Sequence, residues 1–508
     1  MYEQSKLEYS RPFYRYRISD DPEIIKLVAI IYSALLTKGL QVVSGNKFKK
    51  HLMMVLLDLL AAYKGDPKLY ISISRDNMRY RQSKHHKSRR VSFEYTMKVL
   101  DALKNSGYIE HHTGFKDIIA RMTRIKAKPK LTKLFDKHHV SLAVIRHDPD
   151  REIIVLRDGD IDVLYEDTKT TNYYKSDLTK VNALVEVHDI DLKVSNTLHN
   201  QILRDLKIRS KDKTRWRAPS KKNKGKPNAY RMVTIDFTRY LLRRIFTDGS
   251  FELGGRFYGA WYQGIPSKYR RYITIDGCPT VELDYKEMHP TILYSIVGQT
   301  LVNAPYMLDG FDDKDRKKLK VVWNTMVNSP NAEVAKKSLQ YGMPKASLPD
   351  GYDDLDDVFE AFKVKHAAIA EYFFSDYGKK LQYLDSLIAN DVMIILFHYG
   401  VVCLPVHDSF IVDYRYEDFL NYVMGWVFMV HVGVKPNIKK DKTIFDGIKK
   451  NKSYPTAEDM VALIEQVKLE GDTGKDPFSK FHKRRVDKDN AHQTIDLDDY
   501  PLDDIFIL

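Results

Sequence analysis

The fold is most constrained by residues 279–290, whose sequence is PTVELDYKEMHP. Side chains alternate along a strand, so Val281 and Leu283 share one face while Asp284 lies on the other. An apolar run typical of a helix follows within a few residues. The pattern predicts a buried strand that ends in a tight turn before a helix. Asp284, at the end of that strand, either caps the helix or holds a divalent metal ion.

Composition narrows the class of partner. A chain of 508 residues is long enough for about two to four domains, and its formal net charge of +14 favours a polyanion such as nucleic acid, although a general solubility charge is the alternative. The two cysteines, Cys278 and Cys403, form no metal-type cluster and need no disulfide. Apolar runs are too short to span a bilayer, and a charged, aromatic stretch follows Met1 instead of a signal peptide. We therefore expect a cytoplasmic protein with no membrane partner.

Residues 1–150 are predicted to be a helical and winged-helix-like region that binds nucleic acid. Helices are expected at 22–36, 46–63 and 93–105, and strands at 69–74, 108–110 and 121–127. Ser92 can cap the third helix and Gly107 can end it. This order resembles that of winged-helix domains, which place a helix in the DNA major groove. The basic segment 75–90 favours this interpretation over a purely structural helix–hairpin domain.

Residues 151–250 read as a mixed α/β region, either thumb-like or connecting. A strand is expected at 152–156, with helices at 179–189 and 198–206. Residues 207–226 are strongly basic and are predicted to form a loop or arm. Such an arm could hold nucleic-acid phosphates, or it could be a solvated charged loop.

Residues 251–445 carry the candidate chemistry. A helix within 309–329 repeats Arg316, Lys320, Asn324 and Asn328 every four residues, which forms one polar stripe. A loop region is expected at 331–352, helices at 355–372, 379–399 and 416–430, and a hairpin at 400–413 with His407 and Asp408 at its tip. Residues 446–508 are expected to be a flexible tail, basic and then acidic-apolar, whose end could dock on a replication protein.

Asp284 and Asp408 are far apart in sequence, but each ends an apolar strand. Two such carboxylates can hold two Mg²⁺ ions about 3.5–4 Å apart, the arrangement that stabilises the entering and leaving oxygens of phosphoryl transfer. Arg316 and Lys320 lie one helical turn apart between them in sequence. Two cations at this spacing can bind the phosphates of one nucleotide and offset charge on the leaving pyrophosphate.

Several of these segments occur in the order seen in family A DNA polymerases and their relatives, the phage-type single-subunit RNA polymerases. Gly255-Arg256 followed by Gln263-Gly-Ile-Pro266 resembles the Thr-Gly-Arg … Gln-Asn-Ile-Pro segment of the DNA polymerases. Leu283-Asp284-Tyr285 resembles motif A, Arg316-x3-Lys320 the start of motif B, and Val406-His407-Asp408-Ser409 motif C. Gln382 resembles the glutamine that precedes motif C by a helix. The resemblance covers roughly residues 250–445.

The resemblance implies an α+β fold: a polymerase palm, which is an antiparallel sheet with packed helices, and small helical fingers. It implies catalysis by Asp284 and Asp408, which with the backbone carbonyl of Tyr285 would bind two Mg²⁺ ions, with Mn²⁺ as a substitute. Nucleotide contacts would come from Arg316, Lys320, Asn324 and His289. Contacts to a DNA or RNA primer–template would come from Arg256, Gln263, Gln382 and His407.

Departures from the family pattern leave alternatives open. His289 stands where the DNA polymerases have the glutamate that helps to exclude a 2′-hydroxyl, and Ser409 matches the RNA polymerases. Asn324 and Asn328 replace aromatic residues of motif B. We expect a compact DNA polymerase-like nucleotidyltransferase, suited to replication of a phage or mobile element. The alternatives are a primase or single-subunit RNA polymerase, and a non-catalytic DNA-binding replication initiator or regulator on a decayed palm.

Overall fold

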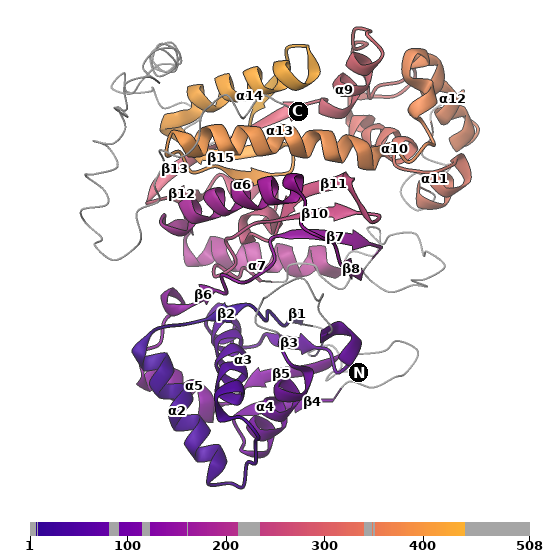
Figure 1. Cartoon of the computed structure of the whole chain (residues 1–508). Coiled ribbons are helices and arrows are strands. Elements are labelled where there is room, and N and C mark those ends of the chain that lie inside the picture. Colours follow the sequence, from indigo (N-terminus) through magenta and orange to yellow (C-terminus); the bar gives the residue numbers. More distant parts are fainter. Residues whose placement is uncertain are drawn as a thin grey trace, which may run out of the picture.

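The computed structural model describes residues 9–80, 91–113, 122–159, 161–211, 234–339 and 351–441, together with Leu7 and Leu348. Figure 1 shows a smaller N-terminal body below a larger body. Each body has its own buried cluster of apolar side chains, one drawn from residues 24–145 and the other from residues 154–428. The larger cluster includes residues on both sides of position 250, so strands before and after that position share one core.

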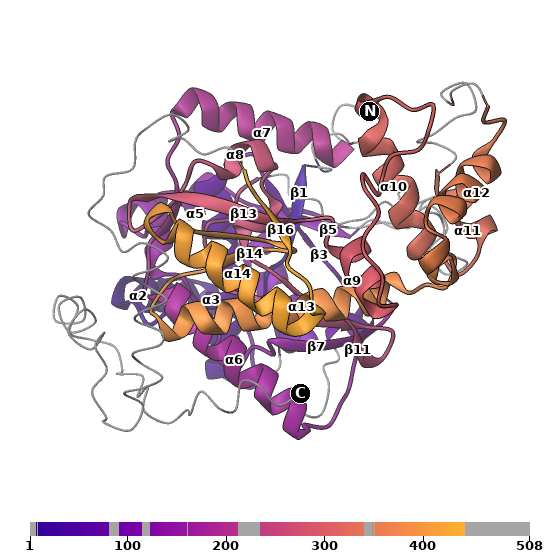
Figure 2. The same cartoon turned by 90° about the horizontal axis from the view of Figure 1, so that it is seen from above.

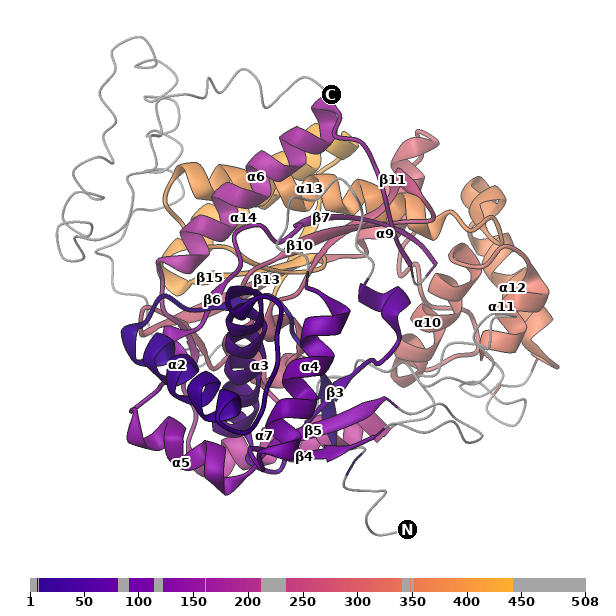
Figure 3. The same cartoon turned by 60° about the horizontal axis from the view of Figure 1, so that its bottom comes forward.

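The N-terminal body packs helices against a small sheet. Its helices are α2 (Pro22–Leu36), α3 (Gly45–Gly65), α4 (Phe93–Asn105) and α5 (Pro129–Lys137). Its sheet has the order β1 (Ser10–Pro12), β3 (Tyr70–Ile73), β5 (Thr123–Ala127) and β4 (Ile109–His112). Helix α3 lies between α2 and α4 (Figure 3), and Phe48, Leu52 and Leu56 on it are almost completely buried.

Local sequence sets the starts and ends of these helices, and the predicted roles of Ser92 and Gly107 are confirmed. The Asp21 side chain accepts hydrogen bonds from the backbone N–H groups of Glu23 and Ile24 at the start of α2, and Ser92 accepts one from Tyr95 at the start of α4. Gly107, with φ +74°, follows the end of α4. Helices 22–36 and 93–105 are therefore confirmed with the predicted bounds.

The larger body contains two sheets. One has the order β11 (Ser250–Tyr258), β10 (Arg243–Thr247), β7 (Ile154–Asp158) and β8 (Ile161–Val163). The other has the order β14 (Leu404–Val406), β15 (Ser409–Asp413), β13 (Cys278–Lys286), β12 (Ile273–Ile275) and β9 (Ile190–Leu192), and β16 (Asn437–Lys440) also pairs with β13. A short antiparallel pair, β2 (Arg17–Ile18) and β6 (Arg146–His147), lies where the two bodies meet (Figure 1).

Helices cover these sheets and form a group at one side. The helices are α6 (Lys169–Glu186), α7 (Asn196–Lys211), α8 (Ser267–Arg270), α9 (Met288–Ile296), α10 (Arg316–Val327), α11 (Ala332–Leu339), α12 (Leu355–Lys365), α13 (Gly378–His398) and α14 (Glu417–Val432). Helices α13 and α14 run side by side over the sheet, whereas α10, α11 and α12 gather beyond its edge (Figure 2). The mixed helix and sheet composition expected from the sequence is confirmed.

Four sequence-based boundaries are wrong. Residues 332–339 are helical, not loop. Helix α6 begins ten residues before the predicted 179, because Thr168 and Thr171 form a capping box there. The expected arm begins as the last turn of α7, and its residues from 212 to 226 lie outside the described part of the chain. The predicted helix 355–372 is interrupted after Lys365, where a 3₁₀ helix takes over and Ile369 has non-helical dihedral angles.

The C-terminal tail, most of the basic segment 75–90 and the tip of the 108–127 hairpin also lie outside the described residues. Within the described part of the chain, no helix is both long and apolar enough to cross a membrane.

Candidate active site

Antiparallel pairing of β13 with β15 brings the two candidate catalytic aspartates together. Asp284 pairs in register with Ser409, the residue after Asp408. The backbone N–H of Tyr285 donates a hydrogen bond to the carbonyl of Asp408 at 3.2 Å. His407, with φ +62°, adopts the left-handed backbone that the tight turn between β14 and β15 requires. Both carboxylates therefore lie at one end of the central strand pair.

The two carboxylates interact electrostatically. Burial, and then the negative charge of Asp408, raise the pKa of Asp284 to about 7, while the charge of Lys320 acts in the opposite direction. Close carboxylates of this kind fit a divalent cation, because the cation offsets their mutual repulsion. No cluster of three or more His, Cys, Asp and Glu ligands occurs among the residues that the structure describes. The two carboxylates of Asp284 and Asp408 suit Mg²⁺, which uses one or two carboxylates and takes its other ligands from water and substrate phosphates.

Buried contacts fix the backbone on either side of this pair. The Tyr285 hydroxyl donates a hydrogen bond to the carbonyl of Met424 on α14 at 2.7 Å, and its ring packs against Phe428 with centroids 5.1 Å apart. Ser409 Oγ donates to Glu282 Oε1 at 2.6 Å, and the same carboxylate accepts from Arg270 Nε at 2.8 Å. Side chains of both strands are thus anchored in the core, and Asp284 at the strand end is half-buried.

Helix α10 brings two cations toward the carboxylates. Arg316 donates to Glu287 Oε1 at 2.8 Å. The charged groups of Arg316 and Lys320 lie 5.4 and 5.3 Å from the centre of the Tyr306 ring. Burial, and then the charge of Glu287, raise the pKa of Tyr306, and Asp408 and Asp284 act in the same direction. Tyr306 therefore contacts both cations and lies close enough to the two carboxylates for their charges to affect its pKa.

Sequence reasoning missed Tyr306 and Glu287. The loop that carries Tyr306 has no periodic pattern, so only the folded chain shows that this buried ring supports both cations. Glu287 was part of the opening stretch, and its φ of +61° in the turn before α9 turns it toward α10. Asn324, on the same helix, is half-buried, and its backbone carbonyl accepts a hydrogen bond from the Asn328 side chain at 2.7 Å.

Arg256 and His289 meet at a third acidic residue, Asp385 of α13. Arg256 Nε donates to Asp385 Oδ1 at 3.0 Å, and His289 Nε2 lies 2.8 Å from Asp385 Oδ2. Although burial opposes it, these hydrogen bonds lower the pKa of Asp385, which is 2% exposed. The structure thus brings together His289, which was expected at the nucleotide, and Arg256, which was expected at the primer–template. Asp385 was not among the expected site residues, because its role depends on partners distant in sequence.

The other expected primer–template residues differ in their surroundings. The Gln263 amide is occupied by backbone groups: its Nε2 donates to the carbonyls of Phe257 and Pro405, each at 3.0 Å. Gln382 is half-buried on α13. His407 is exposed, with its ring 5.7 Å from the Tyr258 ring. Gln263 is therefore better placed to join β11 to the β14 strand than to contact nucleic acid.

Gly255, immediately before Arg256, is expected to tolerate no side chain. Its φ is +74°, and an added Cβ would lie 2.8 Å from Ser386 Oγ and 2.9 Å from the buried Phe246 ring. Gly255→Ala should lower the free energy of unfolding by about 2–4 kcal/mol, which combines left-handed backbone strain with overpacking. Urea unfolding measures the loss.

The matched control for this substitution is Gly249→Ala in the adjacent turn. Gly249 has a similar φ of +68°, but no described atom lies within 4 Å of an added Cβ. Its substitution should cost only the backbone component, about 1–2 kcal/mol. Equal losses for the two variants would contradict the close packing at Gly255.

Comparisons with known proteins add a distant structural likeness. No protein-family model matches the chain, and no curated protein matches it either. Among solved structures, the chain is similar to the POL domain of Pol1 from M. smegmatis in complex with DNA primer-template and dNTP. The sequence identity is 10%, the TM-score is 0.28, and the match covers 84% of this chain and 67% of that one. Because that TM-score is low, the functional argument depends on the site geometry.

Proposed function

We propose that this protein is a template-dependent nucleotidyltransferase that extends a primer by two-metal-ion phosphoryl transfer. The observation that carries the proposal is the meeting of Asp284 and Asp408 at the end of the β13–β15 pair, with Lys320 close enough to influence the pKa of Asp284. Carboxylates that bind metal and cations that bind triphosphate are the parts that phosphoryl transfer needs, because it depends mainly on positioning and charge stabilisation.

In this proposal Asp284, Asp408 and the Tyr285 carbonyl hold Mg²⁺. The bound ions would supply charge stabilisation for the attacking and leaving oxygens. Lys320 is exposed on α10 and binds a triphosphate oxygen. Arg316 is held by its ion pair with Glu287, and the rest of its guanidinium would bind the same phosphates. The Arg256–His289–Asp385 cluster supports the side of the site nearest the nucleotide sugar.

A primer–template held near Asp284 and Asp408 needs basic side chains beside them to bind the phosphates of its strands. Between α8 and β13 lies a cavity lined by Lys268, Arg270 and Arg271, together with Glu282 and Asp441. The Arg271 Nε is buried and has no hydrogen-bond partner among described residues. We propose that this cavity accepts a phosphate of the primer–template, and that the N-terminal body, through α4, contacts the duplex.

Primer extension tests the proposal and also separates the candidate enzymes. Wild-type protein is mixed with a labelled primer on DNA or RNA template, Mg²⁺ or Mn²⁺, and either deoxyribonucleotides or ribonucleotides. Extension with deoxyribonucleotides supports a DNA polymerase, whereas extension with ribonucleotides supports a primase or RNA polymerase. DNA binding without incorporation of either sugar supports the non-catalytic alternative.

Replacing Arg316 or Lys320 by Ala is expected to lower kcat/KM for the incoming nucleotide roughly tenfold to a hundredfold. A hydrogen bond to a charged group contributes about 1.5–3 kcal/mol, and each of these side chains would lose such a bond to the triphosphate. Steady-state incorporation kinetics measure the change, which should appear mainly in KM.

The matched control is Lys317→Ala, which removes the same charge from an exposed position on the same helix. Its kcat/KM should stay close to the wild-type value. If Lys317→Ala is as impaired as Lys320→Ala, a general loss of positive charge explains both effects, and the assignment of Lys320 to the triphosphate is wrong.

A further inference from the structure

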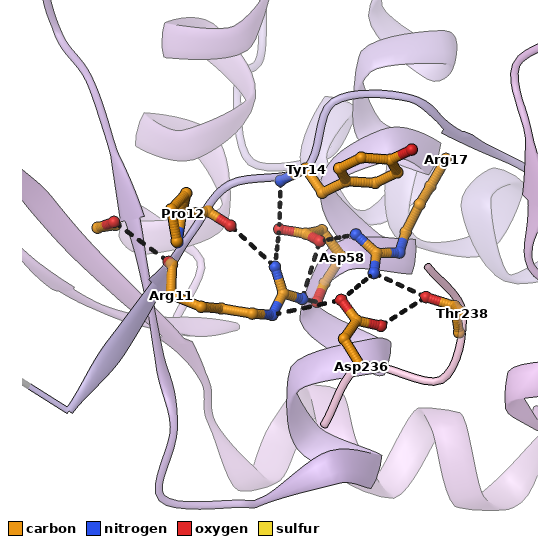
Figure 4. Close-up of polar contacts among 8 residues, drawn as sticks. Arg11, Pro12, Tyr14, Arg17, Asp58, Asp236 and Thr238 are labelled. Carbon is orange, nitrogen blue, oxygen red and sulfur yellow. Dashed lines mark hydrogen bonds and ion pairs between the residues drawn. The ribbon is translucent and has the colours of Figure 1, made fainter. Parts of the chain in front are cut away.

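The contact between the two bodies is built around buried charged groups. Arg11 and Arg17 from the N-terminal segment share the carboxylate of Asp58 on α3, and Arg17 also bonds Asp236 and Thr238 of the larger body (Figure 4). Asp58 is fully buried. Each of these two carboxylates therefore already has arginine partners.

Beside these ion pairs lies a second group, Arg151, Arg239, Arg243, Tyr14 and Tyr16, which we call the junction cluster. The guanidinium carbons of Arg151 and Arg239 lie 5.3 and 5.1 Å from the centre of the Tyr14 ring. That of Arg151 is also 5.3 Å from the Tyr16 ring. The cluster combines side chains from both sides of the contact between the bodies.

Two of its guanidinium groups have unused hydrogen-bonding capacity. Arg151 is 7% exposed, and its Nε has no hydrogen-bond partner among the residues that the structure describes. The Nε of Arg243 is also buried and unpartnered within that part of the chain. Burying such donors without acceptors costs free energy, so their arrangement favours an anionic ligand.

The local potential is positive. Burial lowers the pKa of Arg151 to about 10, and the neighbouring Arg243 and Arg239 act in the same direction. Burial alone would raise the pKa of Tyr16, yet it is lowered, because the charges of Arg15, Arg243 and Arg151 outweigh burial. Tyr16, Arg239 and Arg243 are only half-buried, so the cluster can be reached from solvent.

We propose that the junction cluster binds a backbone phosphate of a nucleic-acid strand that runs along the surface where the two bodies meet. Guanidinium groups present paired N–H donors that match phosphate oxygens. This inference rests on the proposed function only in expecting that the bound strand is a nucleic acid.

The test is the salt dependence of binding of a fluorescein-labelled single-stranded DNA oligonucleotide, measured by fluorescence anisotropy without nucleotides. The variant is the double substitution Arg239→Gln/Arg243→Gln, because both residues are half-buried. Each lost phosphate contact should lower the slope of log K against log salt by about 0.7. We expect a slope lower by about 1.4 and at least tenfold weaker binding at low salt, with an unchanged thermal unfolding midpoint.

The matched control is Arg157→Gln on β7, which removes a partly exposed arginine paired with Asp162 at 2.8 Å. It should bind like wild type. The proposal is overturned if the double variant binds the oligonucleotide with wild-type affinity and slope. It is also overturned if the double variant loses binding of inorganic triphosphate but keeps binding of the oligonucleotide. Binding is measured without catalysis, so the two proposals can fail separately. If the double variant keeps the wild-type slope and the wild-type protein extends primers, only this inference is refuted. If the double variant shows the lower slope and the wild-type protein does not extend primers, only the proposed function is refuted.

Discussion

Replacing either Asp284 or Asp408 by Asn is expected to reduce primer extension by roughly three orders of magnitude or more. Each substitution removes a metal-binding carboxylate from the pair at the end of β13 and β15. Since 1.36 kcal/mol corresponds to a tenfold change in rate, this loss corresponds to about 4 kcal/mol of transition-state stabilisation, a reasonable contribution for metal-ion catalysis. Single-turnover incorporation with saturating nucleotide measures the rate.

Binding of the primer–template is the control for these variants, because neither carboxylate donates a hydrogen bond to a phosphate. Dissociation constants within about threefold of wild type are expected, and small increases in affinity would be consistent with the loss of negative charge. Extension at near wild-type rates by either variant would contradict the catalytic assignment.

Asp284→Asn should also be more stable than wild type at neutral pH when metal is removed by a chelator. The pKa of Asp284 is raised to about 7, so the folded protein retains a proton that the unfolded chain has released near pH 4. The stability of wild type therefore falls as pH rises from about 4 to about 7, whereas Asn contributes no such loss. The advantage of Asp284→Asn in thermal unfolding should be full above pH 7 and absent below pH 4.

The second large effect is expected at the contact between the two bodies. Asp58→Ala would leave Arg11 and Arg17 without their shared carboxylate, although both arginines remain buried. Breaking a buried ion pair from one side typically costs about 3–5 kcal/mol, because it leaves a buried charge uncompensated. Urea unfolding of the full chain should show a loss of that size in the transition of the N-terminal body.

Glu94→Ala is the matched control for Asp58→Ala, because it removes a carboxylate from an exposed pair with Lys98 on the neighbouring α4. It should leave the unfolding transition unchanged. A wild-type unfolding curve for Asp58→Ala would show that the two arginines find other partners, and that the network in Figure 4 does not stabilise the contact.

Local sequence was sufficient to predict the elements that carry the aspartates. Alternation of apolar residues specified β13, and apolar runs on both sides of His407 and Asp408 specified the β14–β15 hairpin. Whether Asp284 and Asp408 meet depended on strand pairing, which the sequence supported only through the resemblance to polymerases. The structure supplies that pairing from β13 and β15 directly.

Residues whose roles depend on tertiary contacts could not be predicted in the same way. Tyr306 lies in an irregular segment, and its closeness to the α10 cations has no local signal. Asp385 lies on the predicted helix 379–399, yet nothing in its neighbourhood in sequence indicates Arg256 or His289 as partners. For Gln263, which is expected at the nucleic acid, local sequence likewise does not indicate that its amide nitrogen bonds two backbone carbonyls.

The central claim is that Asp284 and Asp408 form a metal-dependent site for nucleotide addition. The most direct measurement is incorporation of a labelled nucleotide into a primer–template by the wild-type protein as Mg²⁺ is titrated from zero in the presence of a chelator. The proposal predicts products that appear only with free metal and that the Asp284→Asn/Asp408→Asn double variant does not make. Equal incorporation by wild type and the double variant, or no incorporation by wild type with either sugar and either metal, would contradict it.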